Sequence, residues 1–134
     1  AMRSEGQTLT IVGVDKAGIV PGTGKQDAWF IPFKLSRKPD EVWEKKFAEA
    51  QGMDRDLMKR KAQIIEDVIR VEVLEADDIQ RVLEVIKRQV AEANALCEKD
   101  YQKKMRVREE LETLQARQDS VTQKIREAAD RLNF

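Results

Sequence analysis

Residues 77–133 read DDIQRVLEVIKRQVAEANALCEKDYQKKMRVREELETLQARQDSVTQKIREAADRLN, and this stretch contains neither proline nor glycine. Nothing in it therefore interrupts a helix. Asp77 followed by Gln80 resembles a capping box, which predicts that the helix begins at Asp77. At a rise of about 1.5 Å per residue the helix is about 80 Å long, whereas a domain made from residues 1–76 is roughly 25–30 Å wide. We therefore expect half of this helix to project from the body of the protein.

A heptad pattern of apolar residues runs along the whole helix. Its core positions, a and d, recur every three or four residues, and all of them except Asp100, Lys104 and Gln118 are apolar. A pattern sustained over more than four heptads is typical of a coiled coil. The a positions are Leu83, Val90, Cys97, Lys104, Leu111, Gln118, Ile125 and Leu132, and the d positions are Ile79, Ile86, Ala93, Asp100, Val107, Leu114, Val121 and Ala128.

The two halves of the helix have different apolar faces. Before residue 98 the face is wide, because Val82, Val85 and Leu96 join the core positions, and a wide face suits packing on a sheet. After residue 104 the apolar face narrows to the a and d positions, which suits a single partner helix. Asp100 and Lys104 interrupt the pattern between the halves and are spaced to pair with each other. We therefore predict a small head, residues 1–98, and a projecting coiled-coil helix, residues 99–134.

The second half of the helix requires a partner. Burying a large aliphatic side chain is worth about 1.5–3 kcal/mol, and several such side chains together are enough to drive association against its entropic cost. A lone amphipathic helix of this length is marginal in water. The residues predicted to bind the partner are Val107, Leu111, Leu114, Gln118, Val121, Ile125 and Leu132, with the flanking Arg117 and Lys124.

The charges beside the core positions bear on the identity of the partner. A parallel pairing of two copies in register sets Lys103 against Arg108 of the second copy, and the other flanking pairs are nearly indifferent. Antiparallel self-pairing, or a partner with acidic flanks, fits better. Gln118, a polar residue at a core position, is suited to setting the register. We expect a homo-oligomer, in the form of a dimer, or a complex with a partner helix.

The first part of the chain predicts a small antiparallel sheet. Residues 9–14 and 28–36 have the β-branched and alternating patterns of strands, and a glycine-rich loop at residues 15–26 separates them. Pro32 cannot donate a ladder hydrogen bond, so we expect the second strand to lie at an edge or to carry a bulge. Such an edge would be open to pairing across a dimer.

A first helix is predicted after these strands. Pro39 followed by acidic residues indicates a helix start, Trp43, Phe47 and Ala50 recur at the spacing of one buried face, and Gly52 is the expected end.

A third strand follows this helix. Residues 68–74 alternate as a strand, with residues 63–65 as a candidate for another short one. Residues 53–61 are ambiguous, and Leu57 and Met58 suit either a loop or a short helix. The expected fold class is α+β, in the order β-β-α-β-α, with the long C-terminal helix as its last element.

The composition argues against several classes of function. There is no histidine and Cys97 is the only cysteine, which excludes an intramolecular disulfide and a cysteine–histidine zinc site within one chain. We expect no cofactor and no metal. The 25 basic and 25 acidic residues cancel and leave no net field to attract nucleic acid or an anionic membrane. No apolar run reaches membrane-spanning length, and the first residues lack the apolar core of a signal peptide, so the cytoplasm is the expected compartment.

Two alternative functions stay open. The basic runs at residues 59–61 and 103–108, with Lys16 and Lys25 of the glycine-rich loop, suit a nucleic-acid-associated protein, although acidic residues flank the second run. Residues 18–26 also resemble a phosphate-binding loop, but the spacing differs by one and Gln26 replaces the Ser or Thr that binds magnesium. The other alternative is a carboxylate- or lysine-based enzyme with a site at an oligomer interface.

The leading hypothesis is a non-catalytic assembly or adaptor module. Its C-terminal coiled coil self-associates or docks a partner helix, and its head binds another molecule or caps the helix. With no histidine and no nucleophile placed beside a base, we do not expect an enzyme.

Overall fold

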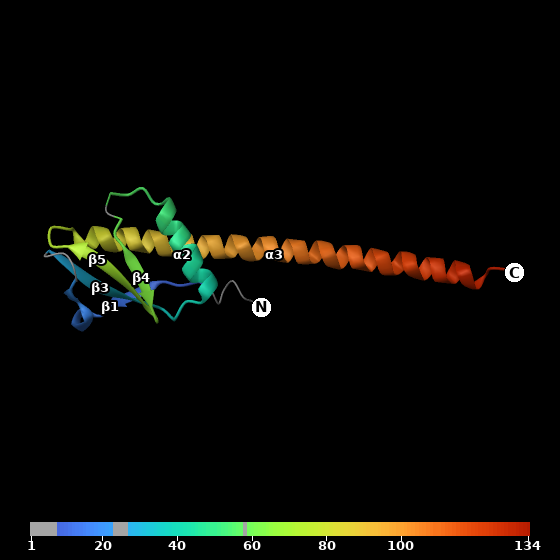
Figure 1. Cartoon of the computed structure of the whole chain (residues 1–134), viewed down its shortest axis with the longest axis horizontal. Coiled ribbons are helices and arrows are strands. Elements are labelled where there is room, and N and C mark those ends of the chain that lie inside the picture. Colours follow the sequence, from blue (N-terminus) through green and yellow to red (C-terminus); the bar gives the residue numbers. More distant parts are fainter. Residues whose placement is uncertain (1–7, 23–26, 58) are drawn as a thin grey trace. The chain divides into compact units, whose positions relative to one another are not determined.

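The protein has an α+β fold with a small antiparallel sheet and a long C-terminal helix, as predicted (Figure 1). The structure, a computed structural model, describes residues 8–22, 27–57 and 59–134. It divides into two compact units, residues 1–98 and residues 99–134. The elements are β1 (Ile11–Val14), the 3-10 turn η1 (Lys16–Gly18), β2 (Val20–Pro21), β3 (Ala28–Leu35), α2 (Glu41–Met53), β4 (Ala62–Ile65), β5 (Val68–Leu74) and α3 (Ile79–Asp130).

A sheet of five antiparallel strands is the framework of the first unit. The strand order is β1-β3-β5-β4, and β2 pairs with the beginning of β3. β2 lies within the segment that was expected to be a loop, and β4 is the short strand for which residues 63–65 were a candidate. A tight turn joins β4 to β5, and in it Glu66 has a φ of 56°. The sheet therefore has two strands more than the order β-β-α-β-α includes.

Of the two alternatives predicted from Pro32, the edge strand is wrong, because β3 is an interior strand between β1 and β5. The pairing of β3 with β1 has a register irregularity, which lies between Ile11 and Gly13 of β1. The carbonyl of Pro32 accepts a hydrogen bond from the Asp15 N–H at 3.0 Å. In an antiparallel strand the N–H and C=O positions of one residue point to the same neighbour. The nitrogen of Pro32 therefore faces η1, between the segments that pair as β1 and β2, where no ladder bond is needed. Because both sides of β3 are paired within the sheet, β3 is not available for pairing across a dimer.

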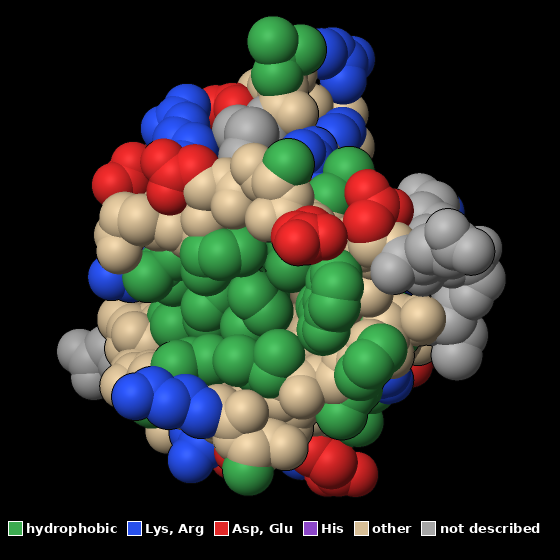
Figure 2. Space-filling view, turned by 90° about the vertical axis from the view of Figure 1, so that its left-hand side faces the viewer, with side chains coloured by type: hydrophobic (Ala, Val, Ile, Leu, Met, Phe, Trp, Pro, Cys, Tyr) green, Lys and Arg blue, Asp and Glu red, His purple; other side chains and the backbone are tan. Residues whose placement is uncertain are grey.

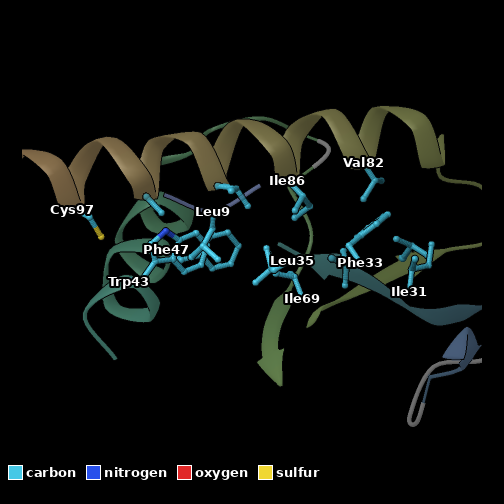
Figure 3. Packing of buried hydrophobic residues seen from close by; sticks show 14 residues of the cluster. Leu9, Ile31, Phe33, Leu35, Trp43, Phe47, Ile69, Val82, Ile86 and Cys97 are labelled. Carbon is cyan, nitrogen blue, oxygen red and sulfur yellow. The ribbon is translucent and has the colours of Figure 1, made fainter. Parts of the chain in front are cut away.

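The core of the first unit lies between one face of the sheet and both helices. Side chains of β3 and β5 point toward α2 and toward the first part of α3 (Figure 3). Trp43 and Phe47 of α2 stack with their ring centroids 5.3 Å apart, and both are buried as predicted. The buried cluster comprises Leu9, Ile31, Phe33, Leu35, Trp43, Phe47, Ile69, Val71, Val73, Val82, Ile86, Val90, Ala93 and Cys97.

Both long helices begin at an aspartate. Asp40 caps α2 by accepting a hydrogen bond from the Trp43 N–H at 2.8 Å. Asp78 has the equivalent role in α3, because its carboxylate accepts from the N–H groups two and three positions further on, at 3.1 and 3.4 Å. The prediction that Asp77 caps this helix is wrong. The Asp77 carboxylate instead accepts two hydrogen bonds from the Arg60 guanidinium.

The end of α2 also differs from the prediction. The helix continues through Gly52 to Met53, and the N–H of Asp54 closes it by donating to the carbonyls of Ala50 and Gln51. The described residues between α2 and β4 form no further helix, and Leu57 is exposed. The suggestion for Met58 lies outside the described residues.

Candidate helix-binding surface

The second unit, residues 99–134, carries a row of exposed apolar side chains along α3. Each of its large members is between 46% and 63% exposed, and every side chain from Arg106 onward is exposed. The members lie three, four or seven residues apart, which places them on one side of the helix. We call this set the apolar row; it consists of Val107, Leu111, Leu114, Val121, Ile125 and Leu132.

The end of the row differs slightly from the prediction. The regular part of α3 stops at Asp130, not at residue 133. The N–H of Leu132 donates to the Ala129 carbonyl at 3.1 Å, so the chain continues as a turn. Leu132 therefore follows the helix instead of belonging to it.

The middle of the row forms a shallow hollow on the helix surface. Its lining contains two sets of four residues with the spacing i, i+3, i+4, i+7, beginning at Leu111 and at Leu114. In a coiled coil, four residues on one helix surround each side chain that enters from the other helix. The hollow is lined by Leu111, Leu114, Gln115, Arg117, Gln118, Val121 and Thr122.

Charged residues flank the row on one side. At the positions called g, immediately before each a position, the chain has basic residues in four of five heptads. We call these four exposed residues the basic row, and within the described chain none of them forms an ion pair with a carboxylate. By contrast, Lys104 pairs with Asp100 at 3.1 Å and Arg108 pairs with Glu112 at 3.3 Å, both along the helix. The basic row consists of Lys103, Arg117, Lys124 and Arg131.

After Arg108, the opposite flank has no charged residue at its e positions. Gln115 donates to Asp119 at 2.9 Å, and the hydroxyl of Thr122 donates to the carbonyl of Gln118 at 2.8 Å. Ala129 completes this flank. The predicted partner-binding residues therefore lie together. The apolar row runs between the basic row on one flank and mainly uncharged side chains on the other.

In the first unit the heptad positions from Ile86 to Cys97 are covered by the chain itself. Ile86, Val90, Ala93 and Cys97 of α3 are all at most 5% exposed and pack in the core of the sheet. The same sequence pattern thus continues over both units, but it is buried from Ile86 to Cys97 and exposed from Val107 onward.

The first unit contains a polar cluster that the sequence did not indicate. Gln89 is buried in α3 and donates to the Asp54 carboxylate at 2.9 Å, and Arg88 donates to the same group. Burial opposes ionisation of Asp54, but the hydrogen bonds from Arg88, Gln89 and the Asp56 N–H outweigh it and lower its pKa to about 2. This cluster fastens the end of α2 to α3.

The basic run at residues 59–61 is also engaged within the first unit. Lys59 Nζ donates to the carbonyl of Gln51 at 2.9 Å. The guanidinium of Arg60 makes hydrogen bonds of 2.6 and 2.7 Å to Asp77, and these lower the pKa of that carboxyl. Two of its three basic side chains thus have partners within the chain. Lys16 lies in η1, whereas Lys25 and Gln26 are outside the described residues.

A second apolar surface lies on the first unit, at the end of the sheet where β3 begins and β5 ends. Figure 2 shows this side of the molecule, with apolar side chains gathered near its centre. Ile19 and Ile79 are 40% and 42% exposed there. A shallow hollow at this place is lined by Ile19, Trp29, Ile31, Val73, Leu74, Glu75 and Ile79.

Comparison of the chain with family models, with curated proteins and with solved structures gives no match. The surfaces described above are therefore the features that bear on its function. Within the described residues, no three cysteine or carboxylate side chains are grouped so that they would hold a metal ion. Neither helix in this part of the chain combines the length and the apolar composition that a membrane crossing requires.

Proposed function

We propose that this protein is a non-catalytic assembly or adaptor module that self-associates or docks a partner helix through the residues from Val107 to Leu132. The observation that carries the proposal is the apolar row, whose six large side chains are all about half exposed, five of them along α3 and Leu132 directly after it. Exposed apolar patches of this extent are uncommon on monomeric proteins and mark interaction surfaces.

The shape of the row supports a helix as the partner. The row is two positions wide and is bordered by polar or charged side chains, as in a two-stranded coiled coil. Gln118 belongs to both of the four-residue sets that line the hollow, and each set is suited to surround one side chain from such a helix. An isolated helix is marginally stable in water, so packing on a second helix would also stabilise residues 104–132.

A double substitution tests the proposal. Leu114→Asp with Val121→Asp places two carboxylates in the middle of the row, and burying them against a partner would be strongly unfavourable. The matched control is Ala116→Asp with Gln123→Asp, which adds the same charge to the same helix at exposed positions away from the row. Self-association is measured by sedimentation, and binding of a synthetic amphipathic helix with a leucine seam is measured by fluorescence anisotropy.

We expect the parent and the control to associate, with themselves or with the synthetic helix, and the Leu114/Val121 variant to remain monomeric and unbound. The proposal is wrong if the parent neither self-associates nor binds the synthetic helix at high micromolar concentration. It is equally wrong if the Leu114/Val121 variant associates as the parent does.

A further inference from the structure

The basic row is the feature of the second unit that the apolar row alone does not explain. Lys103, Arg117, Lys124 and Arg131 lie on one flank of the apolar row, where the flanks of two paired helices meet. All four are exposed, and within the described chain none of them forms an ion pair with a carboxylate. Arg117 has no acidic residue three or four positions away on either side. This flank therefore presents positive charge to whatever covers the apolar row.

Antiparallel self-pairing, one of the two arrangements that the flanking charges were expected to favour, does not complement this flank. In antiparallel pairs each g position faces g positions of the other helix. The g positions of this helix are Lys103, Glu110, Arg117, Lys124 and Arg131. Glu110 is then the only acidic residue available to four basic ones, so most of the flanking contacts are repulsive.

A second copy in parallel orientation does not complement it either. Each g position then faces an e position of the other helix, and the e positions after Arg108 are Gln115, Thr122 and Ala129. Lys103 meets Arg108, and the two copies of Lys104 meet within the core. The acidic residues of this part of the helix other than Glu110 lie outside the flanking positions, at Glu109, Glu112, Asp119, Glu127 and Asp130.

We propose that the occupant of the apolar row is an amphipathic helix of another protein whose flanking residues facing the basic row are Asp and Glu. This inference rests on the proposed function and names the chemistry of its partner. The aliphatic seam supplies affinity, and the charges supply selection among helices with similar seams. Gln118 favours a partner with a polar residue at the layer that it faces, because a polar core residue sets the register.

The size of the charge effect follows from the exposure of the basic row. An exposed ion pair changes an equilibrium by at most about fivefold. Each pair gives between about 1.4-fold and fivefold, so four pairs together give a preference between about fourfold and several hundredfold. This preference is measurable but smaller than the contribution of the seam. Screening at about 1 M salt shortens the range of these interactions to roughly 3 Å and should remove most of the preference.

Three synthetic peptides test the inference on the full chain. They share one Leu/Ile seam of about five heptads and differ only in having Glu, Gln or Lys at every e and g position. Binding of each labelled peptide is measured by fluorescence anisotropy at low salt and again at about 1 M salt. Flanks of a single charge also keep the Glu and Lys peptides from pairing with themselves.

We expect the Glu peptide to bind at least about fourfold more tightly than the Gln peptide at low salt and the Lys peptide to bind most weakly. Arg117→Glu with Lys124→Glu should reverse the order of the Glu and Lys peptides. Arg106→Glu with Arg126→Glu, which makes the same change in charge outside the flanking positions, should preserve it.

Two results would overturn the inference while leaving the proposed function in place. One is equal affinity for the three peptides at low salt. The other is a homodimer, sensitive to Leu114→Asp with Val121→Asp, that an excess of the Glu peptide does not displace. If the chain binds no peptide and remains monomeric, both the proposed function and this inference are wrong.

Discussion

The indole of Trp43 and the side-chain amide of Asn94 are joined by a hydrogen bond of 2.8 Å from Nε1 to Oδ1. The same oxygen accepts from the N–H of Leu9 at 3.0 Å, and Nδ2 of Asn94 donates to the carbonyl of Leu9 at 2.8 Å. One side chain of α3 therefore holds α2 and the segment before β1 against the same point of the core.

Replacing Asn94 with leucine should destabilise the head. The indole N–H of Trp43 and both backbone groups of Leu9 would lose their partner. Leaving a buried polar group without a partner costs about 1–3 kcal/mol, so the three groups together should cost at least about 3 kcal/mol. Urea unfolding followed by tryptophan fluorescence and by circular dichroism measures the change. Lys87→Leu, at an exposed position of the same helix, is the control and should change the free energy of unfolding by less than about 0.5 kcal/mol. Equal stability of the two variants would show that the Asn94 contacts contribute nothing.

Stability should fall in acid partly through Asp54. The pKa of this carboxyl is lowered from 3.8 to about 2 in the folded protein. The folded state thus binds the proton less tightly than the unfolded state does, so the contribution is present above about pH 4 and is lost as the pH falls toward 2. Asp54→Asn should be less stable than the parent at pH 7 by about 1.5–3 kcal/mol, and the difference should shrink below pH 4. Denaturant titrations between pH 2 and pH 7 test this, and a difference that does not depend on pH would contradict it.

Glycine is required at position 18 because of close packing on Pro32. A Cβ at this position would lie 2.8 Å from Cγ of Pro32 and 2.9 Å from Oδ2 of Asp15. Gly18→Ala should therefore destabilise the protein by about 1–3 kcal/mol. Gly13→Ala is the matched control, since a Cβ there meets nothing within 4 Å, and it should be neutral or slightly stabilising. Thermal unfolding of both variants checks the contrast, which would be refuted if Gly13→Ala were the more damaging change.

Two residues at the same heptad position should differ in their effect on the head. Ile86 and Leu114 are both at d, but Ile86 is fully buried, whereas Leu114 is 60% exposed. Ile86→Ala should reduce the free energy of unfolding by about 2–5 kcal/mol. Leu114→Ala should change unfolding of the head, followed by fluorescence of its two tryptophans at low protein concentration, by less than about 1 kcal/mol. A similar loss in both variants would mean that Leu114 supports the head directly.

Much of the fold could be predicted because its signals are local. The alternation in residues 68–74 marks β5, and the spacing of Trp43, Phe47 and Ala50 marks the buried face of α2. Interior β3 was mistaken for an edge strand because the missing N–H of Pro32 faces η1, a relation between residues far apart in the chain. The cap of α3 was misplaced by one residue, since Asp77 and Asp78 are adjacent and only the position of Arg60 separates their roles.

The polar contacts of the head could not be predicted from the sequence, because they too join residues that are far apart in the chain. Asn94, Gln89 and Asp54 are ordinary polar residues in a charge-rich chain, and no periodicity sets them apart. Apart from the Asp56 N–H, which donates to Asp54, the partners named above come from segments between 34 and 85 residues away. Such pairings are decided by how the helices pack on the sheet.

The sequence by itself determined the long helix and the apolar row, because a helix depends on residues three and four positions apart and the heptad spacing of apolar residues can be read directly from the sequence. The tertiary structure alone decided which part of the pattern is covered. From Ile86 to Cys97 the sheet and α2 remove the pattern from water, and from Val107 onward the described chain leaves it exposed. Burial depends on which distant residues arrive at a surface, and the spacing of residues along one helix contains no information about that.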